Sequence, residues 1–376
     1  MAEPLRLFIL AGEPSGDRLG AHLIAGLRAR VPLALTGVGG SAMIAEGLTP
    51  LFPMGDLSVM GFADVAKRLP KLLWRLEQTA RAVLKSDPDV VVLIDAQVFS
   101  QEVAKRLRKR GFTKPILLYV APTVWAHAPE RAARLKPVFD EFLAVLPFEP
   151  AKVLALGGPP TLYVGHPAVA EASIPSAPLP RGQVALLPGS RQGELARHLP
   201  VFRALAESLA RHQAVTGLFL PTLPELQARL SREIASWPVK VDLIVDRGER
   251  ARRYGQTILA VSSAGTATLE LALKGVPTLV TYVMDARQAK VFEAHGRPPV
   301  SLPNIILEHS LLPELVRAQL GADAVVEAAR GLLDEPARRQ AQVDGFARLL
   351  ALMAADSEGR PAIDPAERVL HHAGRG

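Results

Sequence analysis

Short apolar runs alternate with amphipathic stretches along the chain from Leu5 onward. This alternation is typical of βαβ units, in which buried parallel strands are joined by helices. In the first half, the apolar runs predict strands at residues 5–10, 33–38, 90–95, 116–121 and 142–146. Apolar residues at helical spacing between these runs, as at 19–28 and 103–109, predict the connecting helices. The first half is therefore predicted to form a doubly wound α/β lobe.

The pattern fades in a proline-rich stretch, residues 166–183, that is typical of a linker. After it, apolar runs predict a second set of strands at 184–187, 218–221, 243–245, 258–262 and 278–282, and helical patterns follow at 323–333 and 338–354. We expect two Rossmann-like lobes, 1–167 and 168–345, with a substrate cleft between the carboxyl ends of their sheets. A C-terminal helical segment, 346–376, completes the predicted organisation.

Composition narrows the class of protein. The 376 residues exceed the size at which one hydrophobic core usually keeps growing, which favours two domains. The absence of cysteine excludes disulfides and thiolate metal sites and fits a reducing compartment. No apolar run approaches the roughly 18–20 residues of a membrane-spanning helix, so we expect membrane contact to be peripheral. The first residues read as a buried strand and not as a signal peptide, so no secretion is predicted.

The formal charge of +7 and the pI near 9.8 indicate an anionic partner. Nucleic acid, a nucleotide and acidic lipid headgroups are the candidates. Aromatic residues make up only 5% of the chain, and no basic stretch is interleaved with stacking aromatics, so nucleic acid is disfavoured.

Two segments of the first lobe contain candidate substrate-binding or catalytic residues. The first strand runs into AGEPSGD, which places Glu13, Ser15 and Gly16 at a strand-to-helix turn that could bind an anion or a sugar hydroxyl. The alternative is that Ser15 or Asp17 only caps the helix. The strand at 90–94 is wholly apolar and ends in Asp95, a good position for a general base, although Asp95 could equally cap the next helix.

The second lobe offers two similar turns. In LPGSRQGEL, a group of three residues, Gly189, Ser190 and Arg191, suits a phosphate at a helix N-terminus, unless Arg191 is a surface charge paired with Glu194. In SSAGTATLEL, Gly265 and Thr266 precede a helix that carries Glu270. A carboxylate there could hold both ribose hydroxyls or could merely complement the helix dipole.

Several common site types are not expected. Neither turn of the first lobe matches the dinucleotide pattern G-x-G-x-x-G, which disfavours a nicotinamide enzyme. The metalloprotease pattern H-E-x-x-H and the serine-hydrolase pattern G-x-S-x-G are absent as well. We therefore expect no metal and no cofactor.

One amphipathic segment, residues 59–76, has the pattern of an interfacial helix. Its apolar positions include Phe62, Val65, Leu69, Leu72 and Leu73, and the cations Lys67, Arg68 and Lys71 recur beside them. An aliphatic face flanked by cations suits an anionic membrane surface. The alternative is an ordinary helix that faces the core, with a kink at Pro70.

Taken together, the motifs resemble the lipid A disaccharide synthase family. The resemblance rests on these blocks in order: AGEPSGDRLGAHL, GVGGSAMIAEG, LSVMGFADV, IDAQVFS, YVAPTVWAHAPERA, LPFE, YVGHP, LLPGSRQGEL, SSAGTATLELAL, VSLPNIIL and PELV. It implies a GT-B fold and an inverting transfer of 2,3-diacylglucosamine from UDP-2,3-diacylglucosamine to 2,3-diacylglucosamine 1-phosphate, with a β-1,6 linkage formed and UDP released.

The same resemblance assigns roles to residues. Asp95 would be the general base and Arg191 would balance the leaving diphosphate, while Glu13 falls in the matching N-terminal loop. Glu270 would match the nucleotide-lobe acid, and Asn304 would match the family's site asparagine. The segment 59–76 would meet the inner face of the inner membrane from the cytoplasm, and the C-terminal helices would cross back to the first lobe or exchange within a homodimer.

The chain departs from the family pattern at a few positions, which are Val98, Ser100, His127, Ala264 and Arg317. Val98 and Ser100 replace an acid and an asparagine just after Asp95, so we expect any helper role there to be lost. The departures leave the acyl-chain preference and the exact acceptor open. The alternative function is another GT-B UDP-sugar enzyme, either a glycosyltransferase with a different lipid acceptor or a UDP-sugar epimerase.

Overall fold

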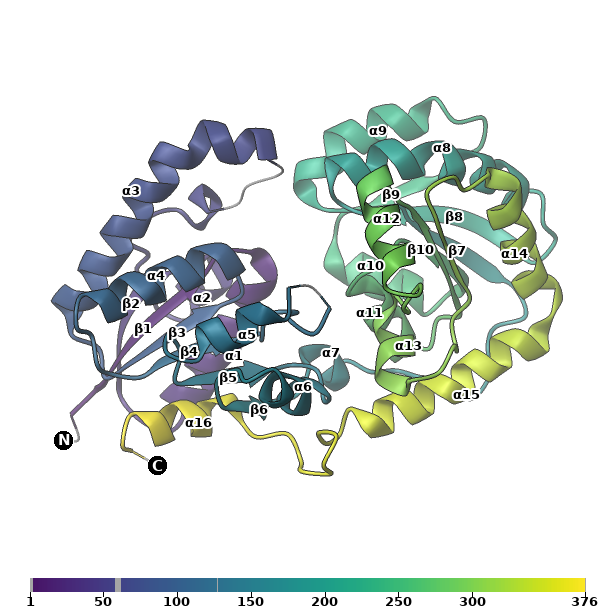
Figure 1. Ribbon diagram of the computed structural model, residues 1–376. Coiled ribbons are helices and arrows are strands. Elements are labelled where there is room, and N and C mark those ends of the chain that lie inside the picture. Colours follow the sequence, from purple (N-terminus) through teal and green to yellow (C-terminus); the bar gives the residue numbers. More distant parts are fainter. Residues whose placement is uncertain (1–2, 58–61, 127, 376) are drawn as a thin grey trace. The chain divides into compact units, whose positions relative to one another are not determined.

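The computed structural model describes residues 3–57, 62–126 and 128–375, with the side chains of residues 62–68 outside the description (Figure 1). The chain divides into two compact units, Met1–Pro167 with Met353–Gly376, and Ala168–Leu352. Each unit holds one parallel six-stranded sheet with helices on its faces. The α/β class predicted from the apolar pattern is confirmed for both units.

The sheet of the first unit has the strand order β2-β1-β3-β4-β5-β6. Its strands are β1 (Leu5–Ala11), β2 (Leu33–Val38), β3 (Val90–Ile94), β4 (Ile116–Tyr119), β5 (Glu141–Ala144) and β6 (Thr161–Tyr163). Strands β3, β4 and β5 are buried along their whole length, as expected of central strands covered on both faces. The edge strand β6 was not predicted, because its three residues form no recognisable apolar run.

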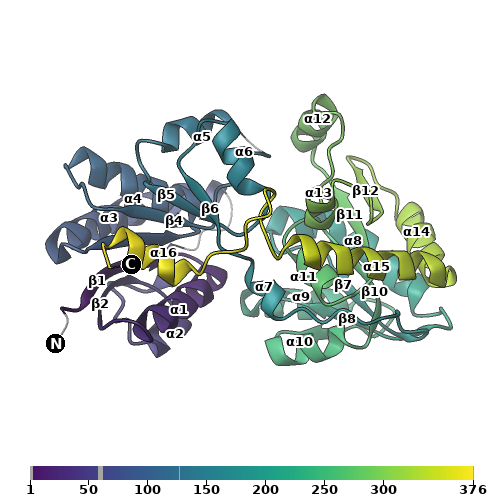
Figure 2. The ribbon, with the colours of Figure 1, turned by 90° about the horizontal axis from the view of Figure 1, so that it is seen from below.

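Helices cover both faces of this sheet. They are α1 (Pro14–Arg28), α2 (Ser41–Ala45), α3 (Phe62–Ser86), α4 (Gln97–Lys109), α5 (Glu130–Leu135), α6 (Glu149–Ala155) and α16 (Pro365–His372), with α7 (Pro167–Ala170) at the boundary between the units. Helix α3 continues through Pro70 without a break and extends ten residues beyond the predicted end at 76. The C-terminal helix α16 packs beside α1, so the end of the chain completes the first unit (Figure 2).

The sheet of the second unit has the order β12-β11-β10-β7-β8-β9. Its strands are β7 (Gly182–Leu187), β8 (Val215–Pro221), β9 (Asp242–Ile244), β10 (Thr257–Ser262), β11 (Thr278–Val283) and β12 (Glu314–Arg317). Its helices are α8 (Gln192–Leu209), α9 (Gln227–Ala235), α10 (Arg247–Tyr254), α11 (Ala267–Leu273), α12 (Ala286–Ala294), α13 (Leu302–Leu307), α14 (Ala322–Asp334) and α15 (Pro336–Leu352). The edge strand β12 was not predicted, because its residues are only partly buried and form no clear apolar run.

The C-terminal part differs from the expected boundaries. Helix α15 runs unbroken to Leu352, and the second unit ends there and not at 345. Residues 353–376 then belong to the first unit. Among the described residues, no helix is both long enough and apolar enough to cross a bilayer.

Candidate functional site

The turn that follows β3 is strained. Asp95 and Ala96 both adopt left-handed backbone conformations, with φ of 51° and 46°. Such conformations cost a non-glycine residue roughly 1–3 kcal/mol each and persist only where the surroundings enforce them. Three hydrogen bonds hold the turn: the Asp95 N–H donates to the Tyr119 carbonyl at 3.0 Å, the Ser100 hydroxyl donates to the Asp95 carbonyl at 2.8 Å, and the Ser100 N–H donates to the Ala96 carbonyl at 2.9 Å. Ser100 therefore does have a supporting role, contrary to our expectation.

The environment of Asp95 opposes its ionisation. Burial raises the pKa of its carboxyl to about 6, the negative charge of Glu13 adds to the rise, and a hydrogen bond from the Ala96 N–H partly offsets it. Ala96, and not Asp95, occupies the N-cap of α4, and no side chain in the described part of the chain caps that helix. The alternative that Asp95 is a helix cap is therefore wrong. A carboxyl with a pKa near neutrality has the property expected of a general base.

Two glycines of AGEPSGD let the next turn approach this one. A Cβ on Gly12 would lie 2.5 Å from the Cβ of Ala96, and a Cβ on Gly16 would lie 3.3 Å from a methyl group of Ile94. Only residues without a side chain permit such close backbone packing. The close packing brings exposed Glu13 to the end of β3.

The remaining polar residues of that turn differ in burial and in their hydrogen bonds. Ser15 is exposed in the first turn of α1, and none of the described side chains caps that helix. Asp17 is buried and accepts hydrogen bonds from the N–H groups of Gly40 at 2.7 Å, Ala42 at 2.9 Å and Met43 at 3.1 Å. Asp17 therefore caps the neighbouring helix α2, which sequence spacing could not reveal. The alternative in which Ser15 or Asp17 caps its own helix is wrong.

In the second unit, the LPGSRQGEL loop lies between β7 and α8. Gly189 has a φ of 102°, and a Cβ there would lie 2.7 Å from a carboxylate oxygen of Glu194. The Arg191 guanidinium lies 2.9 Å from Glu194, which confirms the ion pair that the sequence left as an alternative. The Arg191 side chain is nonetheless 84% exposed, and such a pair contributes little, about 0–1 kcal/mol. Exposed Ser190 and Arg191 thus retain donors for an anion.

The second loop, SSAGTATLEL, lies at the end of the adjacent strand β10. The Ser263 hydroxyl lies 3.3 Å from the point that a Cβ on Gly189 would occupy, so the two loops are neighbours. Gly265, with a φ of 134°, and Thr266 are exposed at the start of α11, and Glu270 is exposed one turn later. The fold therefore places these predicted residues together at the carboxyl ends of the two central strands, β7 and β10, of the second sheet.

A family model described as lipid-A-disaccharide synthetase matches residues 7–360. The chain belongs to this family. The lipid-A-disaccharide synthases of Bradyrhizobium diazoefficiens and Nitrobacter hamburgensis are 37% and 38% identical to it, over 97% and 99% of this chain and 96% and 97% of the relatives.

Solved structures share the fold of this lipid-A-disaccharide synthetase family member. The UDP-GlcNAc 2-epimerase from Neisseria meningitidis has a TM-score of 0.64 at 12% identity and covers 99% of this chain and 100% of its own. The glycotransferase of kitacinnamycin has a TM-score of 0.61 at 16% identity with the same coverage, 99% of this chain and 100% of that chain. At these identities the likeness shows the fold alone, which is that of GT-B enzymes.

Asn304, which we expected to bind substrate, is buried and fully used inside the protein. Its amide nitrogen donates to the Leu312 carbonyl at 2.9 Å and to Glu314 at 2.8 Å, and its oxygen accepts from the N–H groups of Leu311 at 2.9 Å and Leu312 at 2.8 Å. Glu314 also accepts from the Ser301 hydroxyl at 2.6 Å. Two donors and two acceptors are the capacity of an asparagine side chain. Two blocks of the lipid-A-disaccharide synthetase family, VSLPNIIL and PELV, therefore fasten α13 to β12, and we revise the role of Asn304 accordingly.

The departures from the lipid-A-disaccharide synthetase pattern occupy different environments. Val98 is exposed in the first turn of α4, whereas Ser100 is buried. Ala264 is half-buried before α11, and Arg317 is exposed at the end of β12. His127 lies outside the described residues. Val98 is thus the departure that presents a new apolar surface close to Asp95 along the chain.

The exposure of helix α3 changes along its length in the part whose side chains are described. Leu69, Leu73 and Trp74 are 47%, 48% and 57% exposed, whereas Leu76 is buried. The other predicted contact residues divide as follows: Leu72 is half-buried, Lys71 is exposed, and the side chains of Phe62, Val65, Lys67 and Arg68 lie outside the described residues. Exposed large apolar side chains that lie close together are typical of an interaction surface.

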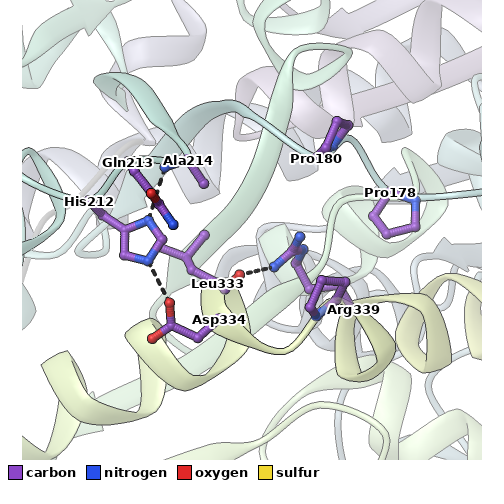
Figure 3. A pocket seen from close by; sticks show the side chains of 9 residues that line it. Pro178, Pro180, His212, Gln213, Ala214, Leu333, Asp334 and Arg339 are labelled. Carbon is purple, nitrogen blue, oxygen red and sulfur yellow. Dashed lines mark hydrogen bonds and ion pairs between the residues drawn. The ribbon is translucent and has the colours of Figure 1, made fainter.

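A cavity of about 320 Å³ lies elsewhere in the second unit (Figure 3). It is lined by Pro178, Pro180, His212, Gln213, Ala214, Leu333, Asp334, Pro336 and Arg339. Arg339 is buried and donates to the Leu332 and Leu333 carbonyls at 2.6 Å, and His212 pairs with Asp334 at 2.9 Å. These contacts cap the end of α14. The cavity lies at the amino ends of β7 and β8, away from the candidate residues of this unit.

Proposed function

We propose that this chain transfers 2,3-diacylglucosamine from UDP-2,3-diacylglucosamine to 2,3-diacylglucosamine 1-phosphate and so makes the β-1,6-linked disaccharide 1-phosphate and UDP. Membership of the lipid-A-disaccharide synthetase family over residues 7–360 supports the reaction class, which is glycosyl transfer. The observation that carries the mechanism is the Asp95 carboxyl, which a strained turn holds at the end of β3 with a pKa of about 6.

The chemistry requires one base and one anion-binding group. Asp95 removes the proton of the acceptor 6-hydroxyl while its oxygen attacks the anomeric carbon of the donor. The new carbon–oxygen bond forms on the face opposite the bond to the diphosphate, which breaks, so the anomeric configuration inverts. The proton remains on Asp95, and the Arg191 guanidinium balances the negative charge that develops on UDP.

The two units divide the binding of the substrates. The N-terminal unit takes the acceptor through the turns that carry Glu13, Ser15, Gly16 and Asp95. In the C-terminal unit, backbone N–H groups at the turns of Gly189, Ser190, Gly265 and Thr266 bind phosphate oxygens. Glu270, exposed beside them, accepts hydrogen bonds from the ribose hydroxyls.

The exposed part of α3 around Leu69, Leu73 and Trp74 binds an anionic membrane surface. Leu69, Leu73 and Trp74 enter the interface between headgroups and acyl chains, and Lys71 contacts the phosphates. Acylated substrates reside in that layer, so attachment there delivers them to the first unit. The enzyme is accordingly peripheral on the cytoplasmic face of the inner membrane.

The experiment that tests this function supplies both diacylated substrates in mixed micelles to the purified chain and identifies the products by mass and by NMR. We expect one equivalent of UDP for each β-1,6 disaccharide formed. Conversion of the UDP-sugar to an epimer without acceptor, or turnover only with another acceptor, would replace the proposed reaction by a different GT-B activity.

A further inference from the structure

The segment that follows β4 begins beside the candidate base. The N–H of Asp95 donates to the carbonyl of Tyr119 at 3.0 Å, and the Gln97 amide donates to the carbonyl of Val120 at 3.2 Å. Val120 has a φ of 72°, which is a rare conformation for a β-branched residue. Residues 121–126 therefore start from a strained position that is hydrogen-bonded to the Asp95 turn.

Trp125 is the aromatic residue of this segment, and it is fixed on two sides. Its ring meets the Phe148 ring edge-on at 4.9 Å between centroids, with an angle of 86°. Its indole N–H donates to a carboxylate oxygen of Glu149 at 3.2 Å. The side chain is only half-buried, so part of a rigidly held indole faces outward.

Glu149 is an unusual partner because it is almost fully buried. Its second oxygen accepts from the Leu146 N–H at 3.1 Å, and burial raises the pKa of its carboxyl to about 7. The hydrogen bonds from Leu146 and Trp125 lower the pKa of Glu149 less than burial raises it. Burying a carboxyl is costly, and a packing role would be better served by an apolar side chain.

We infer that Glu149 is a positioning residue that holds Trp125, and that the outward part of the Trp125 indole forms a wall of the binding site for the acceptor sugar ring. This inference rests on the proposed function. An indole presents a flat apolar face to the C–H groups of a pyranose and loses little entropy when it binds, because its own orientation is already fixed. The acceptor hydroxyl is thereby directed toward Asp95.

Two conservative variants test the inference. Trp125→Phe keeps an aromatic ring and removes the indole N–H, and Glu149→Gln keeps the size of the side chain and removes its charge. Each should raise the KM for the 1-phosphate acceptor about tenfold. Trp125→Phe loses the hydrogen bond to Glu149, and in Glu149→Gln the single amide oxygen can accept from only one of the two N–H groups, those of Trp125 and Leu146. The KM for the UDP-sugar and the affinity for UDP should stay within about twofold, because the nucleotide binds the other unit.

Trp237→Phe is the matched control, since Trp237 is buried in the second unit and its indole N–H has no hydrogen-bond partner among the described residues. It should leave the acceptor KM unchanged. A normal acceptor KM in folded Trp125→Phe, or an equal rise of both KM values, would overturn the inference. Thermal unfolding checks the fold, and if Glu149→Gln does not fold, Trp125→Phe alone decides. Failure of the wild-type chain to use the diacylated pair would instead refute the proposed function and, with it, this inference.

Discussion

The carboxyl group of Asp95 determines the expected pH dependence of the reaction. Its pKa is raised to about 6 by burial and by the charge of Glu13. A general base acts only when it is deprotonated, so kcat/KM should be level above this pH and fall about tenfold per unit below it. A pH–rate profile measured from pH 4.5 to 8 gives the pH at which this fall, the acidic limb of the profile, begins.

Glu13→Gln should move the same limb to lower pH. Removing the negative charge removes one of the two causes that raise the pKa of Asp95, while burial continues to hold it above the ordinary value. Glu102→Gln is the control, because it removes an equal charge from α4 at a half-buried position where Glu102 pairs with Lys105. A limb that stayed in place in Glu13→Gln, or that moved to higher pH, would contradict the electrostatic account.

At the residue scale, the sequence predicted where a residue lies in the fold better than it predicted the hydrogen-bond partners of that residue. Asp95 could be placed at the end of a buried strand because apolar runs mark such strands. The hydrogen-bond partners of Asp17 lie at the start of another helix, and those of Asn304 lie on a loop and a strand that follow it. No spacing rule could therefore show that both side chains are hydrogen-bonded inside the protein. The supporting role of Ser100 was missed because the family comparison treats position 100 as a lost asparagine.

At the element scale, α3 carries the proposed membrane contact. Changing Leu69, Leu73 and Trp74 to Ser should weaken binding to anionic vesicles by more than about tenfold, since each apolar side chain in the interface contributes roughly 1–2 kcal/mol. Vesicle flotation measures this. Leu154→Ser is the matched control, because Leu154 is 71% exposed but lies on another helix, α6. Equal binding of the triple variant and the control would remove the membrane role from α3.

The elements that could be predicted are those with long apolar or amphipathic patterns. Central strands such as β3 and β10 are buried throughout, and their runs are unambiguous. The edge strands β6 and β12 are short and partly exposed, so the same signal is weak there. Pro70 suggested a kink, yet α3 continues past it.

At the scale of the whole molecule, the last residues of the chain are part of the first unit. Arg368 on α16 holds Glu141 on β5 with two hydrogen bonds, at 2.6 and 2.9 Å, and Glu141 is buried. The pKa of Glu141 is lowered by its hydrogen bonds to His372 and Arg368, although burial opposes this. These contacts join segments more than 200 residues apart, which the periodicity of the sequence could not reveal.

Arg368→Met should destabilise the first unit by about 3 kcal/mol, because it leaves a buried carboxylate without its main partner. Urea denaturation measures the change in the free energy of unfolding. Arg30→Met removes a pair with Asp364 in which both side chains are more than a third exposed, so its effect should stay below about 1 kcal/mol. Equal effects of the two changes would show that the C-terminal helix does not depend on the buried pair.

The most direct test of the account is the activity of Asp95→Asn, in which the side chain keeps its size and loses its basicity. Asp87→Asn, at an exposed position before the same strand, is the matched control. We predict that Asp95→Asn loses roughly 10²- to 10⁴-fold in kcat while its affinity for UDP and its fold are retained. Near-normal turnover in that variant would contradict the assignment of Asp95 as the base and the mechanism built on it.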